Sequence, residues 1–178
     1  MPVHAGPDTA TGPVAQYELR CSLWAPLPID RVFGFFESPG NLALITPRWL
    51  RFEIRTSGGI HMKRGLNIDY TIRWLGLPLG WTSRITEYDP PRLFVDEQVR
   101  GPYRSWHHRH DFFPDGQGTI ISDCVAYSLP LGVLGRVAHA LTVKWQLLAI
   151  FRFRQRAVAK LLEVDCTTIE APVIRRLP

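Results

Sequence analysis

Residues 103–129, YRSWHHRHDFFPDGQGTIISDCVAYSL, predict two antiparallel strands joined by a tight turn. The turn formers lie between Pro114 and Gly118, which is typical of a β-hairpin. Alternation along the first strand divides its side chains between two faces: Trp106, His108, His110 and Phe112 lie on one, and Ser105, His107, Arg109 and Asp111 on the other. We take the aromatic face as the inner one.

The same alternation continues toward the N-terminus, with turn formers between the segments. Short connections of this kind join antiparallel neighbours. The expected strands are 14–24, 50–55, 66–75, 81–88, 93–99, 103–113 and 119–129, which makes a sheet of seven strands.

Helical patterns interrupt and follow these strands. Two short helices are expected between the first strand and residue 47, ended by Pro39-Gly40 and by Pro47. Residues 132–163 predict one long helix with apolar side chains at helical spacing: Leu134, Ala138, Leu141, Trp145, Leu148, Phe151, Val158 and Leu162. We therefore expect an α+β fold in which a seven-stranded antiparallel sheet curls around a long C-terminal helix.

Length and composition indicate one globular domain. The chain has 178 residues, with 46% hydrophobic and 21% charged side chains, so it can bury a core without disulfides or metals. Its net charge of +5 is spread along the chain, and no nucleic-acid-binding motif accompanies it, so we expect no nucleic acid partner. Cys21, Cys124 and Cys166 have neither metal-type nor redox-type spacing, which favours reduced thiols in the cytoplasm.

No segment predicts a membrane span. The most apolar stretch, 129–151, is interrupted by Arg136, His139 and Lys144. Arg152, Arg154, Arg156 and Lys160 fall within the predicted helix, and we interpret them as a solvated basic face. Such a face could also meet an anionic membrane, so a peripheral lipid-handling protein stays open as an alternative.

Several segments resemble the START-like SRPBCC superfamily, the helix-grip fold of polyketide cyclases, plant hormone receptors and lipid-transfer domains. The distinctive ones are 94–98, 100–103 and 127–130, with Trp106, His108 and His110 between them. The likeness is greatest to bacterial single-domain proteins described as cyclase/dehydrase-like. It implies one domain over residues 14–165, with a disordered tail at 1–13 and a C-terminal tail at 166–178.

The inner face predicts a cavity, because a solid core would bury its polar groups without partners. We expect a hydrophobic small molecule (a lipid, a quinone or a polyketide-like compound) between sheet and helix, held by a carrier or sensor. The expected ligand-binding residues are Tyr70, Trp74, Trp81, Phe94, Asp96, Gln98, Trp106, His108, His110, Asp123, Tyr127, Leu141 and Trp145. No cofactor is expected.

The histidines leave an enzymatic alternative open. A carboxylate of Asp96 or Asp123 beside His108 or His110 would orient the imidazole and raise its pKa, as in general acid–base catalysis. His108, His110 and Asp123 would then be catalytic in a cyclase or dehydratase, with Tyr70 or Tyr127 as a proton donor. Two histidines on one strand face can also ligate a metal, but we expect none, because any alternating strand produces this spacing.

Overall fold

The computed structural model describes residues 16–58, 60–74 and 76–178. Its core element is one antiparallel sheet of eight strands in the order β2-β3-β4-β5-β6-β7-β1-β8. The strands are β1 (Tyr17–Ala25), β2 (Glu53–Ile54), β3 (Asn67–Trp74), β4 (Leu77–Asp89), β5 (Leu93–Arg100), β6 (Ser105–Asp115), β7 (Gly118–Ser128) and β8 (Thr167–Arg176). The predicted tail 1–13 lies outside the described residues.

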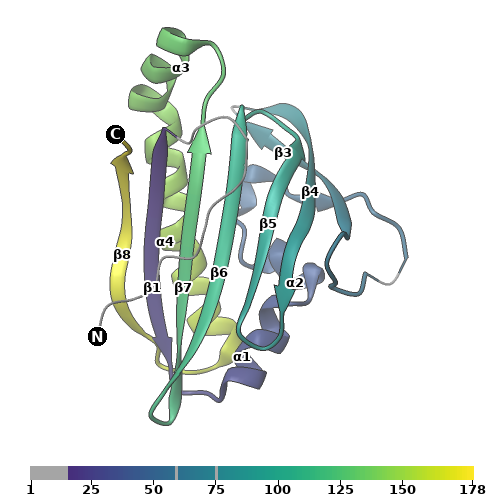
Figure 1. Cartoon of the computed structure of the whole chain (residues 1–178), viewed down its shortest axis with the longest axis vertical. Coiled ribbons are helices and arrows are strands. Elements are labelled where there is room, and N and C mark those ends of the chain that lie inside the picture. The colour runs from purple at the N-terminus through teal and green to yellow at the C-terminus, as the bar shows by residue number, and fades with distance from the viewer. Residues whose placement is uncertain (1–15, 59, 75) are drawn as a thin grey trace.

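Helices lie against one face of this sheet and close its lower end (Figure 1). They are α1 (Ile29–Phe36), α2 (Pro39–Leu44), a 3-10 turn η1 (Arg48–Leu50), α3 (Gly132–Ala138), a π-helical turn η2 (His139–Val143) and α4 (Lys144–Leu162). The helix α4 runs behind β1 and β7, and α3 projects beyond the end of the sheet (Figure 1). The α+β class, the antiparallel sheet and the long C-terminal helix are confirmed.

The strand count is corrected from seven to eight. Residues 166–178, which we expected to form a tail, contain β8, and it pairs antiparallel with β1. This strand lies at the edge of the sheet and carries Pro172. Proline is tolerated at an edge because one side of the backbone has no neighbouring strand to bond.

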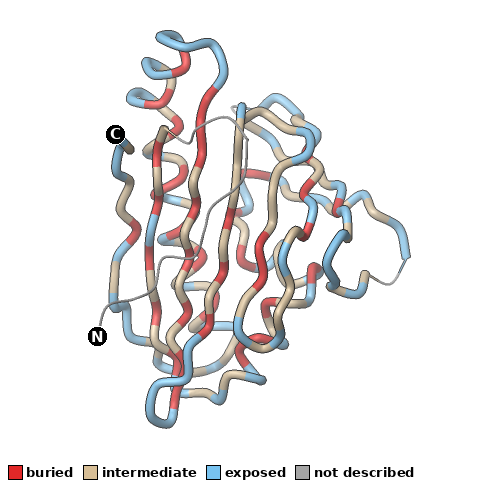
Figure 2. The backbone as a smooth tube through the Cα atoms, in the orientation of Figure 1, coloured by how far each residue is buried: buried red, intermediate tan, exposed pale blue. Residues whose placement is uncertain are grey.

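The aromatic face of β6 is the inner face. His108, His110 and Phe112 are buried, whereas the side chains of His107 and Arg109 are about two-fifths exposed, at 45% and 39%. The burial alternates in the same way along β7, which pairs with β6, and along β1, which pairs with β7 (Figure 2). The choice of inner face made from aromatic content is therefore correct.

The buried apolar side chains form two clusters instead of one continuous core. One lies around α1 and contains Phe33, Phe36 and Phe112. The other packs α4 against β1 and β7 and contains Leu19 and Tyr127. The curled half of the sheet, β3 to β6, faces open volume beside them.

The predicted long helix is present, and Leu148, Phe151 and Val158 of the expected stripe are buried, but the earlier part of the stripe is not. Leu134, Leu141 and Trp145 are 70%, 70% and 59% exposed, while Val143 and Leu147 are buried. The π turn η2 adds a residue to one helical turn and so rotates the side chains that precede it relative to those that follow. A pattern with ordinary α-helical spacing cannot include that rotation.

Candidate functional site: an apolar cavity with a buried polar cluster

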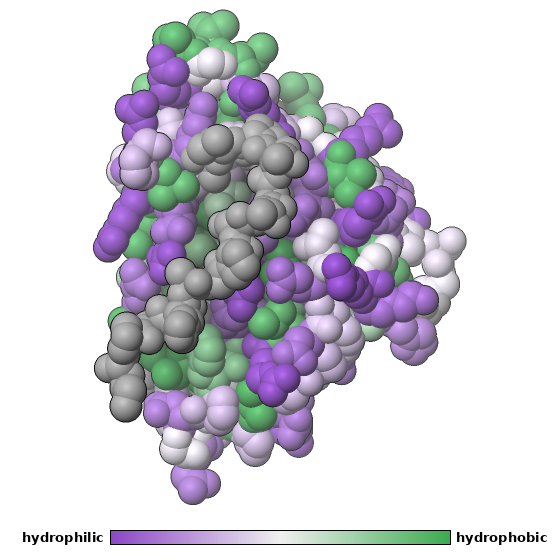
Figure 3. Space-filling view, viewed as in Figure 1, coloured by the Kyte–Doolittle hydropathy of each residue, from purple (hydrophilic) through white to green (hydrophobic). Residues whose placement is uncertain are grey.

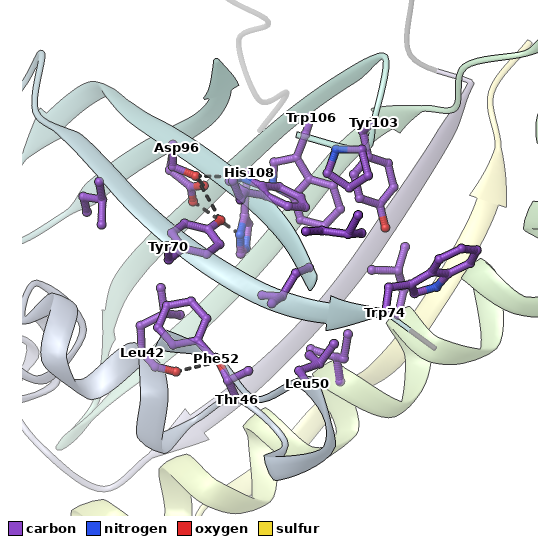
Figure 4. A pocket seen from close by; sticks show the side chains of 18 of the residues that line it. Leu42, Thr46, Leu50, Phe52, Tyr70, Trp74, Asp96, Tyr103, Trp106 and His108 are labelled. Atoms are coloured by element: carbon purple, nitrogen blue, oxygen red, sulfur yellow. Dashed lines mark hydrogen bonds and ion pairs between the residues drawn. The ribbon is translucent and has the colours of Figure 1, made fainter. Parts of the chain in front are cut away.

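A cavity of about 420 Å³ lies between the curled sheet and α4. Its walls are mainly apolar and come from nearly every element: α1, α2, η1, β3 to β6, α3 and α4. Figure 4 shows Leu42, Thr46 and Leu50 on one side of this space and Tyr70, Trp106 and His108 on the other. The volume is in the range of pockets that enclose one small organic molecule.

Eight of the thirteen predicted ligand-binding residues line the cavity. They are Tyr70, Trp74, Trp81, Phe94, Asp96, Trp106, His108 and His110. Their strands explain this convergence, because Tyr70 lies opposite Trp81 in the β3–β4 register and Phe94 opposite His110 in the β5–β6 register. Neighbours in a ladder point to the same side of a sheet.

The other five lie elsewhere. Gln98 bonds the backbone of Tyr103 through both ends of its amide, at 2.7 and 3.2 Å, and so fixes the β5–β6 connection. Leu141 and Trp145 are exposed on the far side of the helix. These three placements correct the predicted site.

Tyr127 and Asp123 lie behind the cavity wall. Tyr127 is fully buried, and its hydroxyl lies 2.8 Å from Nε2 of His139 in the π turn. The His139 ring stacks on Tyr17 at 3.6 Å between centroids. Burial, with a smaller effect of Lys144, lowers the pKa of His139 to about 4, so the ring is neutral near pH 7 and shares a hydrogen bond with the Tyr127 hydroxyl. Tyr127 therefore joins sheet to helix.

A polar cluster of two carboxylates and two imidazoles is set into the cavity wall. Nε2 of His108 lies 3.0 Å from Asp123 and Nε2 of His110 lies 3.3 Å from Asp96. Nδ1 of His108 lies 3.5 Å from Asp96. Nδ1 of His110 is 2.9 Å from Asp123, but its direction does not satisfy a hydrogen bond. The expected pairing of His108 and His110 with both carboxylates is thus present.

Ser83 extends this cluster toward the aromatic wall. Its hydroxyl lies 3.2 Å from Oδ1 of Asp96 and 3.2 Å from the Tyr70 hydroxyl, and it accepts the indole N–H of Trp81 at 3.1 Å. Asp96 is the most exposed of the four charged or imidazole groups, with 19% of its side chain accessible against 5 to 8% for the others. Asp96 and Tyr70 therefore present the polar part of the wall to a ligand.

Burial and mutual contact fix the charges of the cluster. Burial opposes ionisation of Asp96 and Asp123, but the histidine contacts outweigh it and lower both pKa values. Burial lowers the pKa of His108 to about 4, helped by the adjacent His110. For His110 the contacts with Asp123 and Asp96 outweigh burial and raise its pKa. The cluster therefore favours ionised carboxylates, a neutral His108 and the charged form of His110.

A positive charge comes from Arg154 of α4, which lines the cavity and is only 9% exposed. Its position corrects the predicted solvated face: Arg152, Arg156 and Lys160 are exposed, but Arg154 is not. Helical geometry predicts this difference, because residues two apart in an α-helix point about 200° apart, whereas residues four apart share a face.

Asp96, His108 and His110 bring one ligating atom each to within 4.8 Å of one another, which is a spacing compatible with a bound metal ion. The same atoms are engaged in the hydrogen bonds and close contacts described above. The absence of a metal stays a prediction. No helix within the described ranges is both long and apolar enough to cross a bilayer.

Similar solved structures share this architecture at low sequence identity. The protein TTHA0849 from Thermus thermophilus has a TM-score of 0.62 and 16% identity, covering 81% of this chain and 98% of that one. Ginseng major latex-like protein 151 from Panax ginseng has a TM-score of 0.60 and 13% identity over 81% and 95%. Ara h 8.0201 has a TM-score of 0.55 and 16% identity over 80% and 97%.

The chain has the helix-grip fold. Its structural neighbours include Bet v 1-like proteins. No protein-family model matches the sequence, and no curated protein matches it.

Proposed function

We propose that this protein binds one hydrophobic small molecule, a lipid, quinone or polyketide-like compound, in the cavity between sheet and α4, as a carrier or sensor. The observation that carries the proposal is the cavity itself, about 420 Å³ of mainly apolar wall beside two separate core clusters. A protein interior is normally packed without such voids. A ligand would restore the contacts that the walls lack.

The mouth of the cavity supports entry of an apolar molecule. Leu131 and Leu134 line the cavity and are 75% and 70% exposed, so they stand at its rim. Apolar side chains gather over α3, at the top of the view in Figure 3. An apolar rim lets a ligand leave water in steps before it reaches the aromatic wall.

The polar cluster favours binding over acid–base catalysis. Both ring nitrogens of His108 lie within 3.5 Å of a carboxylate oxygen, and so do both of His110, with Nδ1 of His110 buried against Asp123. A general acid or base needs a ring nitrogen within reach of the substrate. Such a nitrogen becomes free only after the cluster rearranges, so the cyclase or dehydratase remains the second candidate, with Asp96 and Tyr70 as the groups nearest a substrate.

Native mass spectrometry of the freshly purified protein, followed by denaturation, tests the proposal. We expect the native mass to exceed the mass of the chain by that of one organic molecule, and we expect denaturation to release this molecule. A retained mass of zinc or iron would contradict the metal-free interpretation of the histidine cluster. Chemical conversion of the released molecule on incubation with the protein would overturn the carrier interpretation in favour of the enzyme.

A further inference from the structure

Arg154 is a buried cation that has no hydrogen-bond acceptor and no ion-pair partner within residues 16–58, 60–74 and 76–178. Its Nε atom is among the buried atoms that lack an acceptor there. A lysine in this position can lose its proton, but arginine stays charged in proteins. The guanidinium therefore keeps a full charge and free N–H donors beside an apolar space.

The nearby groups do not satisfy this charge directly. Asp96 is the one carboxylate among the described residues that line the cavity, and its oxygens already serve Ser83, His108 and His110. The cluster acts on Arg154 through space, and no atom of it lies within ion-pair distance. Asp96 therefore attracts Arg154 from a distance, but it leaves the N–H donors of Arg154 without an acceptor.

The aromatic contact of Arg154 leaves those donors available. Its guanidinium carbon lies 4.8 Å from the ring centroid of Phe151, on the same helix. A cation–π contact of this kind supplies no lone pair, so the N–H groups of the guanidinium still lack a hydrogen-bond acceptor. The guanidinium plane matches a carboxylate, which accepts two parallel hydrogen bonds.

We propose that the ligand is an apolar monocarboxylic acid whose carboxylate binds Arg154 while its hydrophobic part fills the cavity. This inference rests on the proposed function and specifies its ligand class. One permanent positive charge lines the cavity within the described part of the chain, which favours a single negative charge over a phosphate dianion. The remaining walls offer mainly apolar and aromatic surface, including Trp74 and Trp106 in Figure 4.

The test compares dodecanoate with dodecanol, which have the same chain but differ in charge. Binding is followed by displacement of the uncharged fluorophore phenylnaphthylamine at pH 7.5. We expect the parent protein to bind dodecanoate at least tenfold more tightly than dodecanol. Equal affinity for the two would overturn the inference and leave the proposed function standing. If the protein binds neither dodecanoate, dodecanol nor the fluorophore, both this inference and the proposed function are wrong.

Variants of the helix locate the effect. Arg154→Met should abolish the preference for the acid and leave dodecanol affinity within twofold, whereas Arg152→Met on the exposed face should bind as the parent does. Arg154→Lys, which keeps the charge but not the paired donors, should retain part of the preference. A structural role for Arg154 would instead weaken both probes equally and lower the Tm, and that result would contradict the assignment.

Discussion

Nε2 of His108, which lines the cavity, lies 3.0 Å from a carboxylate oxygen of Asp123, which is buried behind the cavity wall. Asp123 also has Cys21 opposite it on β1, with the thiol 3.8 Å from its second oxygen. The carboxylate thus lies at the back of the cluster, facing away from any ligand. Its role is to hold the imidazoles that line the cavity.

Replacing Asp123 by Asn should be strongly destabilising. The change removes the charge that compensates His110 in a buried site, which typically costs about 3–5 kcal/mol of unfolding free energy. Urea unfolding at pH 7.5 measures it. Asp115→Asn, in the exposed β6–β7 hairpin, should stay within about 0.5 kcal/mol of the parent. Equal stabilities of the two variants would show that the cluster contributes little.

Stability should fall as the pH drops from about 6.5 toward 4. The pKa values of His108 and His139 are lowered to about 4 in the folded protein, so below their ordinary pKa of 6.5 the unfolded chain binds protons that the folded chain does not. The loss of unfolding free energy that comes from His108 has an upper limit of about 3 kcal/mol. His110 has a raised pKa, so its stabilising contribution is complete below 6.5 and does not offset the fall.

Urea unfolding at half-unit pH intervals measures this profile. The His139→Phe variant should have a shallower slope between pH 6.5 and 4, because it removes one of the two groups while keeping a ring to stack on Tyr17. A parent protein with constant stability over this range would show that neither histidine is held neutral by the fold.

Gly135 should not tolerate a side chain. A Cβ at this position would collide with the backbone carbonyl oxygen of Pro130, where the chain passes from β7 into α3. We expect Gly135→Ala to lower the unfolding free energy by about 1–3 kcal/mol. Gly34→Ala in α1 meets open space and should raise it by about 0.5–1 kcal/mol. Thermal unfolding of both variants compares them, and a neutral Gly135→Ala would mean that this connection moves freely.

The sequence predicts the middle of the sheet well because its signals are local. Alternation and the turn at Pro114 to Gly118 specify which side chains of β6 and β7 share a face, so the meeting of His110 with Asp123 follows from the register. Alternation of side chains does not predict the strand β8. It lies at an edge with little burial, so its side chains do not alternate.

The helix limits prediction for a different reason. The start of its buried face depends on the π turn at His139–Val143, which no residue pattern in the chain announces, so the expected stripe misplaces Leu141. Trp145 follows that turn and lies two residues from the buried Leu147, so ordinary helical spacing already places it on the opposite face. Arg154 was predictable in principle from the angle between residues two apart. Its lack of a partner among the described residues is a tertiary property and needs the structure.

The most direct test of the central claim is a titration with phenylnaphthylamine of two variants at adjacent positions of α4. Ile150 lines the cavity, whereas Ala149 is exposed. Ile150→Trp fills part of the cavity and should weaken binding at least tenfold, about 1.4 kcal/mol, while Ala149→Trp should bind as the parent does. Saturable binding by the parent that Ile150→Trp reduces and Ala149→Trp leaves intact is the predicted result. Equal binding by all three folded proteins, or no saturable binding by the parent, would contradict the account.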